Sequence, residues 1–167
     1  VVARTAQTAW GVTYMKGDTI DFFIEDCRRG GRTGWQYRRG RKWIDFEVRE
    51  EVIGRKGNGG ETMRVYFTNV GTLDSDPETH GPGYHLSMAW TGRAAGGGKA
   101  MTTWLEMIFS KSAREAMDVA RECPQPSLCW IVADRDGHIG MQGCGRFPKR
   151  APGHNGVVPL PAWQSRN

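Results

Sequence analysis

Short apolar and β-branched runs, separated by glycine-rich turns, dominate the chain up to Trp90. The clearest run is residues 43–49, where Ile44, Phe46 and Val48 alternate with charged side chains. A period of two predicts a half-buried antiparallel strand. The 23 glycines and seven tryptophans agree, because glycine supplies tight turns and tryptophan supplies large anchors without a helical stripe. The sequence therefore predicts a strand-rich fold.

Other segments follow the same rules. The Gly-rich residues 56–60 separate two strand-like runs and predict a hairpin across residues 44–67. Residues 74–83 are rich in Asp, Pro and Gly and predict a loop. Further strands are expected at residues 9–14, 20–27, 62–67, 84–90, 127–133 and 138–142.

The second half of the chain adds helices. Apolar side chains recur at helical spacing in residues 99–109 and again in residues 112–122. Ser112 and Glu115 stand three residues apart, which is typical of a capping box. We expect a helical insert at about residues 99–122, made of two helices, in an α+β fold with antiparallel sheets.

Length and composition limit the classes of protein. The chain has 167 residues, of which 38% are hydrophobic and 25% charged, so it belongs with soluble globular domains and is long enough for one core. It contains no run of about 18 or more apolar residues, so no membrane span is expected.

The net charge of +5 comes from one basic segment. Seven cations and no acid stand between Cys27 and Trp43, interleaved with Trp35 and Tyr37. One hypothesis is a nucleic-acid-binding module that uses residues 28–42 to neutralise phosphates and stack bases. We favour the other hypothesis, an exposed loop at 27–43 that is merely basic or that pairs with acidic surface elsewhere in a larger protein, because no nucleic-acid-binding fold accompanies it.

The cysteines and histidines form no recognisable site. Cys27, Cys123, Cys129 and Cys144 match no C-x-x-C metal or redox signature. Buried free thiols are favoured over a disulfide or a zinc site, and the sequence does not choose a pairing. Cys129 lies in an apolar run and is expected to be a buried small residue rather than a nucleophile. The four histidines are expected in turns or at the surface.

Two stretches carry patterns that are specific in combination. The first is TAWGVT at residues 8–13, continued by DTIDFFIE at 18–25. The second is VADRDGHIG at 132–140, followed by GRFPKR at 145–150, Gly153, Gly156 and PLPAW at 159–163. In this order they resemble the penicillin acylase family of N-terminal-nucleophile hydrolases.

The resemblance implies an amide hydrolase that cleaves an acylated small molecule, such as a β-lactam or another N-acyl compound. Family members cut themselves during maturation, and the new N-terminal serine of the large β-chain attacks with its own amine as base. Residues 1–167 are then expected to be an internal fragment of one β-chain domain, with a partial family fold and without the serine. It would be inactive alone, and would need the α-chain and the rest of the β-chain in a periplasmic or secreted protein.

Individual residues can be carried over from the family. Tyr14 falls where a backbone N–H of the oxyanion hole lies, and Arg150 matches an arginine that helps orient the nucleophile region. Asp18, the carbonyl of Ile20, and Asp21 fall on ligands of a structural Ca²⁺. The spacing of Asp18 and Asp21 around a turn permits such a site, although Asp is common in turns.

Cys129 departs from the family pattern. The family places its second oxyanion donor, an asparagine, at this position, and a thiol is a weaker donor than an amide N–H. Loss of one oxyanion donor typically costs about 10²–10³ in rate. A catalytically silent scaffold relative is therefore the alternative to an active acylase.

Overall fold

The computed structural model describes residues 2–57, 59–94 and 96–164. They group into two compact units. The first unit is Val1–Thr19 with Trp90–Pro148, and the second is Ile20–Ala89 with Lys149–Asn167. Neither unit contains a helix, among the residues described, with the length and apolar content needed to cross a membrane. That residues 1–167 belong to a single domain stays a prediction.

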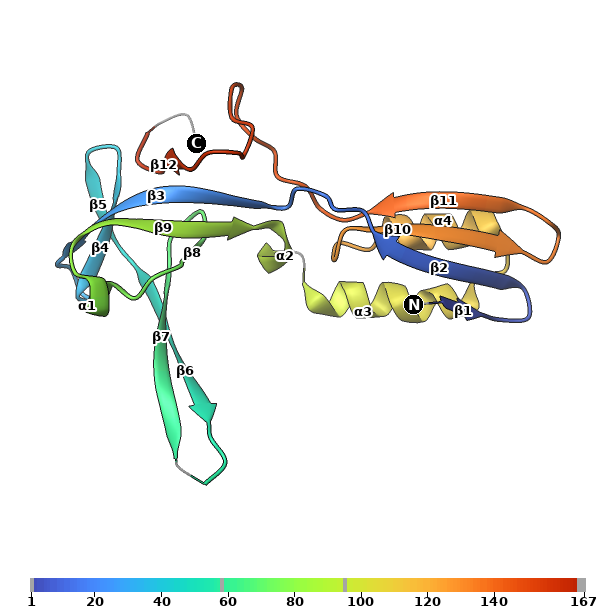
Figure 1. The fold of residues 1–167 in the computed structure, drawn as a ribbon, viewed down its shortest axis with the longest axis horizontal. Coiled ribbons are helices and arrows are strands. Elements are labelled where there is room, and N and C mark those ends of the chain that lie inside the picture. The colour runs from blue at the N-terminus through green and yellow to red at the C-terminus, as the bar shows by residue number, and fades with distance from the viewer. Residues whose placement is uncertain (1, 58, 95, 165–167) are drawn as a thin grey trace. The chain divides into compact units, whose positions relative to one another are not determined.

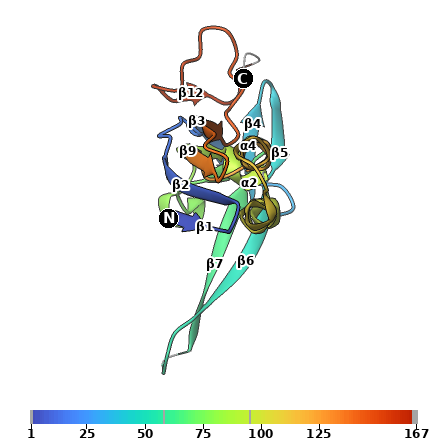
Figure 2. The same ribbon diagram turned by 90° about the vertical axis from the view of Figure 1, so that its right-hand side faces the viewer.

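The first unit is an antiparallel sheet covered on one face by helices (Figure 1). The strand order among the described residues is β1-β2-β10-β11. Figure 2 looks almost along α3 and α4, which lie side by side on one side of these strands. Its elements are β1 (Val2–Arg4), β2 (Thr8–Tyr14), α2 (Thr91–Ala94), α3 (Gly97–Glu106), η1 (Met107–Phe109), α4 (Ala113–Arg121), β10 (Leu128–Asp134) and β11 (Ile139–Cys144). The two helices expected within residues 99–122 are confirmed.

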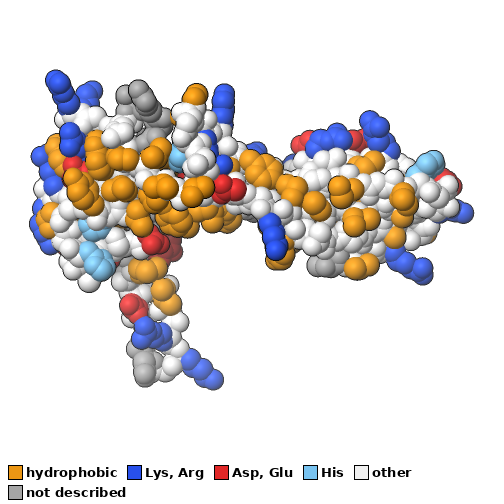
Figure 3. Space-filling view, turned by 45° about the horizontal axis from the view of Figure 1, so that its top comes forward, with side chains coloured by type: hydrophobic (Ala, Val, Ile, Leu, Met, Phe, Trp, Pro, Cys, Tyr) orange, Lys and Arg blue, Asp and Glu red, His pale blue; other side chains and the backbone are white. Residues whose placement is uncertain are grey.

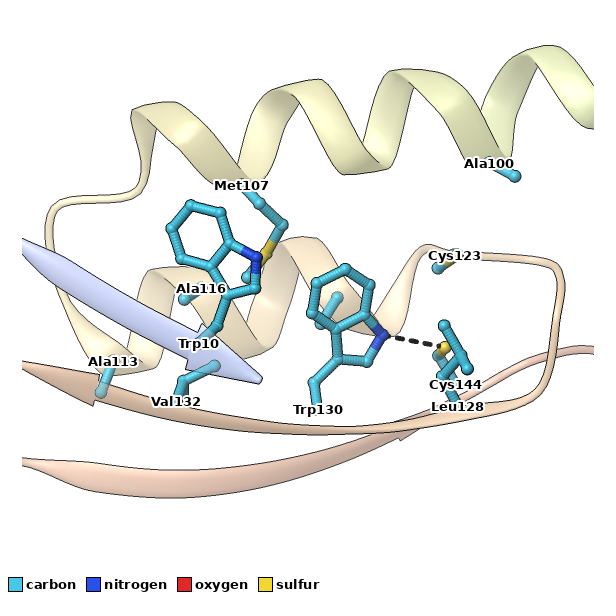
Figure 4. Close-up of a cluster of buried hydrophobic side chains, with 11 residues drawn as sticks. Trp10, Ala100, Met107, Ala113, Ala116, Cys123, Leu128, Trp130, Val132 and Cys144 are labelled. Atoms are coloured by element: carbon cyan, nitrogen blue, oxygen red, sulfur yellow. Dashed lines mark hydrogen bonds between the residues drawn. The ribbon is translucent and has the colours of Figure 1, made fainter. Parts of the chain in front are cut away.

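Alternation along β10 builds the core of this unit. Leu128, Trp130 and Val132 are buried against the helices, and Trp130 has no exposed surface. Small side chains on α4 let the helix approach closely, as Figure 4 shows around the two indoles. The buried residues of the cluster are Trp10, Ala100, Met107, Ala113, Ala116, Ala120, Cys123, Leu128, Trp130, Val132 and Cys144.

The other face of the same sheet is open and largely apolar. Ile131, Ile139 and Met141 point away from the helices and are 59%, 83% and 68% exposed. The register places Ile131 opposite Gly11 on β2 and opposite Met141 on β11, so these side chains form one continuous surface. In the space-filling view of Figure 3, apolar side chains are visible over the strands of the first unit.

Shortening a side chain should cost much more stability on the buried face of this sheet than on the open face. Trp130→Ala should lower the free energy of unfolding by about 3–5 kcal/mol, because it leaves a cavity among fully buried neighbours. Ile131→Ala, one residue further on the open face, should change it by only about 0.5 kcal/mol. Urea unfolding measures both values, and comparable losses would contradict the assignment of faces.

Asp134 joins the β10–β11 turn to the start of α4. Its carboxylate accepts the Ala113 N–H (3.0 Å) and the His138 N–H (2.9 Å). Ser112 caps the helix by accepting the Glu115 N–H, as the capping box predicts. The bond from Ala113, followed by those from His138, lowers the pKa of Asp134 to about 2. Asp134, the first aspartate of the ADRDG motif, therefore has a structural role.

This lowered pKa predicts a pH-dependent contribution. A carboxyl whose folded pKa lies below its unfolded value stabilises the fold above about pH 4 and loses that contribution as the pH falls towards 2. Asp134→Asn should therefore be less stable than the wild type at neutral pH, and the difference should shrink between pH 4 and 2. Urea unfolding at a series of pH values measures it. A difference that stays constant over this range would rule out the charge as its cause.

The second unit is built around one sheet. Its path is β5-β4-β3-β9-β8-β7-β6 among the described residues, and β12 pairs in parallel with β3. The hairpin β6–β7 confirms the prediction for residues 47–67, and it projects from the rest of this unit (Figure 1). The elements are β3 (Ile20–Arg29), β4 (Trp35–Arg39), β5 (Lys42–Asp45), β6 (Glu47–Gly54), β7 (Gly60–Phe67), β8 (Thr72–Leu73), α1 (Pro77–His80), β9 (Gly83–Trp90) and β12 (Leu160–Pro161). Asn58, in the predicted turn, lies outside the described residues.

Two secondary-structure predictions within residues 27–49 of this unit were wrong. The basic segment 27–43 is not a loop: β3 continues to Arg29, and β4 and β5 form a hairpin from residues 35–45. The alternating run 43–49 is not one strand, because it breaks at Phe46, which is 2% exposed and packs against Tyr37 and Tyr66. A pattern with a period of two does not reveal that a chain changes its pairing partner midway, from β4 to β7.

The central strand β3 carries a buried ion pair. Glu25 has no exposed surface, and its carboxylate accepts hydrogen bonds from both terminal nitrogens of Arg39 (2.5 and 2.9 Å) and from Ser87 Oγ (2.9 Å). A bidentate guanidinium together with a hydroxyl offsets the cost of burying this charge. The pair connects β3 to its two neighbours, β4 and β9.

Candidate active site

The end of β2 directs a backbone donor away from its neighbouring strand. Met15 N–H donates to the Ser127 carbonyl (3.2 Å), and Tyr14 lies opposite Leu128. Because hydrogen-bonded and non-hydrogen-bonded pairs alternate in an antiparallel ladder, the Tyr14 N–H points away from β10, towards the β1 side of the strand. The described pairing of β1 covers Ala9 to Gly11 and does not extend to Tyr14. This is the residue predicted to supply an oxyanion-hole N–H.

Cys129 lies beside Tyr14 across the same strand pair. It is paired with Thr13, the residue before Tyr14, and with Gly143 on β11. It is half-buried on the open face of the sheet, so the prediction of a buried small residue was wrong. The structure thus places the two residues predicted for the oxyanion hole on adjacent strands at successive register positions, with the Tyr14 N–H directed away from the strand that carries Cys129. Their roles in an oxyanion hole stay a prediction.

An apolar pocket opens beside Tyr14 within the first unit, on the helix-covered side of the sheet, whereas Cys129 lies on the open face. It has a volume of about 270 Å³ and is lined by Val12, Thr13, Tyr14, Trp104, Pro126 and Leu128. Trp104 packs against the buried Trp130 with a centroid distance of 4.5 Å, so one wall of the pocket rests on the core. Sequence reasoning missed this pocket, because its lining comes from β2, α3 and β10, whose proximity depends on the tertiary fold.

Arg150 and Asp21 form a second predicted pair, in the second unit. Arg150 Nε lies 3.0 Å from both carboxylate oxygens of Asp21, and its Nη2 lies 3.0 Å from Oδ1. The Asp21 side chain is 5% exposed and that of Arg150 19%. Gly156 closes over the pair: its φ is +77°, and a Cβ there would lie 2.5 Å from Asp21 Oδ1. The arginine motif and the glycine after it therefore hold a buried ion pair.

One predicted calcium ligand, Asp21, is the carboxylate of the ion pair with Arg150. Both oxygens of Asp21 face a guanidinium, which already neutralises the carboxylate. Among the described residues, no three or more His, Cys, Asp or Glu side chains converge on a common point. The boundary between the two units falls between Thr19 and Ile20, within the predicted turn. Calcium at Asp18, Ile20 and Asp21 stays a prediction, and the role of Arg150 in orienting a nucleophile does too.

The basic segment is largely occupied by interactions inside the second unit. Arg39 binds Glu25, and acidic partners also lie within 3.5 Å of Arg29, Arg32 and Arg38. Trp35 and Tyr37 are buried, at 0% and 5% exposure, and the Trp43 ring is covered by Arg28 at 4.2 Å. In Figure 3, Lys and Arg side chains fringe the part of the second unit that holds β4 and β5. The arrangement favours an ion-paired structural element over a base-stacking surface.

One histidine contact was also missed. His85 is 7% exposed, which corrects the expectation of a surface residue. Its Nδ1 lies 2.7 Å from Ser75 Oγ, and its Nε2 lies 2.9 Å from the Gly81 carbonyl. The carbonyl requires a proton on Nε2, so the Ser75 hydroxyl donates to Nδ1. Both ring nitrogens are thus engaged in holding the segment between β8 and β9, which includes α1.

Comparison with known proteins decides the family. The sequence matches the family described as Penicillin amidase over residues 1–167. The chain belongs to the penicillin amidase family. An acyl-homoserine lactone acylase, QuiP, of Pseudomonas fluorescens is 30% identical over 96% of the chain and 19% of its own length. Penicillin G acylase of Escherichia coli is 29% identical over 96% of the chain and 18% of its own length.

A solved structure confirms the fold class. The thermostable penicillin G acylase from Alcaligenes faecalis matches 98% of this chain and 29% of that chain, with a TM-score of 0.82 and 22% identity. The chain therefore has part of the penicillin amidase fold, with antiparallel sheets and few helices. It spans about a fifth of the length of the curated relatives that it matches.

The Asp21–Arg150 pair predicts a non-additive stability effect. Arg150→Met should lower the free energy of unfolding by about 3–5 kcal/mol, because it leaves a buried carboxylate without its partner. The double variant Asp21→Leu/Arg150→Met should recover most of this loss. Lys149→Met, at the exposed neighbouring position, is the matched control. Urea unfolding of the wild type, Asp21→Leu, Arg150→Met and the double variant gives the coupling energy, and purely additive losses would contradict the pairing.

Proposed function

We propose that the protein containing this chain is an acylase that hydrolyses the amide bond between an acyl group and an amine. Membership of the penicillin amidase family over every residue supports this, and the relatives named above are acylases. The observation that carries the proposal is the apolar pocket beside Tyr14. An acyl chain in that pocket would bring its carbonyl to the edge of β2, where the Tyr14 N–H is directed.

The size of the pocket suggests the substrate class. About 270 Å³ lies just below the usual range for ligand pockets, and the lining is mostly apolar. Such a site suits one aromatic ring or a short to medium acyl chain. We therefore propose small N-acyl compounds, with β-lactams and N-acyl homoserine lactones as the two classes to compare.

The chemistry assigned to this chain is charge stabilisation. In acyl transfer, the carbonyl oxygen becomes negative in the tetrahedral transition state, and a fixed N–H directed at it lowers the barrier. Tyr14 would supply that donor, and Cys129 would occupy the second donor position. We place the attacking N-terminal serine outside these residues, in a longer chain that includes the remaining partners and resides in the periplasm or outside the cell. Calcium, if bound near Asp21, would be structural, and no step depends on it.

A pocket-filling variant tests the proposal. The protein at its natural length should release amine from phenylacetyl and medium-chain N-acyl amides, measured by a fluorogenic amine assay. Val12→Trp should reduce kcat/KM for these substrates by about 10–200-fold while preserving hydrolysis of an N-acetyl amide. Val157→Trp, at an exposed valine outside the pocket, is the control. An equal decrease in kcat/KM for all substrates, the N-acetyl amide included, would show that the pocket does not recognise the acyl group.

A second variant addresses Cys129. Cys129→Asn restores an amide donor and should raise kcat by about 10²-fold, because a fixed amide N–H stabilises the oxyanion better than a thiol. Cys129→Ala should leave kcat within a few-fold of the wild type. An asparagine variant no faster than the alanine variant would exclude position 129 from the oxyanion hole. Absence of turnover by every variant, with the protein folded, would favour a catalytically silent scaffold instead.

A further inference from the structure

Two of the three cysteines in the first unit are brought together by the backbone. Cys123 follows α4, and Cys144 is the last residue of β11. Gly145 N–H donates to the Cys123 carbonyl, and Arg146 N–H donates to the Pro124 carbonyl, each at 3.0 Å. These bonds hold the segment after the helix alongside the end of the strand. Cys129, by contrast, lies on the open face of the sheet.

The two thiols meet inside the core. Cys123 is 1% exposed and Cys144 4%, and both belong to the same buried cluster. The Cys123 thiol donates to the Gln125 carbonyl at 3.3 Å. Cys144 Sγ accepts the indole N–H of Trp130 at 3.2 Å, the dashed bond in Figure 4. The neighbouring thiol, followed by burial, raises the pKa of Cys123, and the same neighbour relation lowers the pKa of Cys144.

We propose that Cys123 and Cys144 are a disulfide-forming pair that closes when the protein folds in the presence of a small-molecule disulfide. The sequence left the pairing open, and the fold selects one partner for each of these cysteines. The other two are not members of this cluster: Cys27 belongs to the buried cluster of the second unit, and Cys129 points to the opposite face of β10.

The reaction is a double thiol–disulfide exchange. The thiolate of one of the two cysteines attacks one sulfur of oxidised glutathione, forms a mixed disulfide and releases one glutathione thiolate. The thiolate of the other cysteine then attacks the protein sulfur of the mixed disulfide and displaces the second glutathione. In sum, two cysteine thiols lose two electrons and two protons, and one oxidised glutathione becomes two reduced molecules. Because both sulfurs are buried, the exchange should be fast during folding and slow in the folded protein.

The cross-link would fix a segment that includes one wall of the pocket. Pro126 and Leu128, which line the pocket, lie between the two cysteines and close to Cys123 in sequence. A bond from Cys123 to Cys144 would limit separation of this segment from β11. It should also reduce the conformational freedom of the unfolded chain, and so raise the melting temperature by roughly 5–10 °C.

Peptide mapping tests the pairing. The protein at its natural length is refolded with oxidised glutathione, alkylated, and digested with trypsin without reduction. Cleavage after Arg121, Arg135 and Arg146 gives peptide 122–135, with Cys123 and Cys129, and peptide 136–146, with Cys144. The linked species alone does not distinguish Cys123 from Cys129, so the Cys129→Ser variant is mapped in parallel.

The proposal requires the linked species in the wild type and in Cys129→Ser, and its loss in Cys123→Ala and Cys144→Ala. Reduction of the linked protein should lower the melting temperature, whereas Cys129→Ser should melt as the wild type does in both redox states. Free thiols at Cys123 and Cys144 in oxidant-treated protein with a cooperative thermal transition would overturn it. A linkage that disappears in Cys129→Ser would overturn it as well.

Discussion

The packing of a tryptophan-bearing sheet face against an alanine-rich helix sets the geometry of the first unit. Trp130 is fully buried between the sheet and the helices, and three alanines on α4 provide the room for close contact. Because β10 is held in this way, its neighbour β2 is fixed in register, with Tyr14 opposite Leu128. The same indole supports Trp104, and so the wall of the pocket. The core is thus what places the proposed acyl site next to the proposed oxyanion donor.

The second unit depends on charges buried along a single strand. β3 presents Asp21 and Glu25 inward, and each is neutralised by an arginine from another element, Arg150 and Arg39. Such pairs add little net stability compared with apolar packing, but either partner alone is costly, so they favour one arrangement of the chain over alternatives. Several acidic and basic positions of the family-like motifs are therefore explained by folding rather than by chemistry.

Sequence reasoning succeeded where local physics dominates. The capping box at Ser112 and the helical spacing that follows it predicted α4, and apolar runs bounded by turn residues predicted strands such as β2 and β10. Sequence reasoning failed at Phe46, where the chain changes the strand with which it pairs. It also failed in the basic segment, where arginines form ion pairs with acidic residues distant in sequence. Tyr14 and Cys129 were placed together only through the family resemblance, because 115 positions separate them in the sequence. The pocket, the Asp21–Arg150 pair and the Cys123–Cys144 contact required the tertiary structure.

The direction of the Tyr14 amide has an evolutionary consequence. A donor that belongs to the main chain is present whatever amino acid other than proline occupies the position. The side chain there, which lines the pocket and is 74% exposed, can therefore change in size or polarity without removing the proposed oxyanion donor. A substitution at this one position could then alter the substrate range while the backbone donor, and the catalysis that depends on it, is kept. A scaffold of this kind can acquire a new acyl preference without first passing through an inactive intermediate.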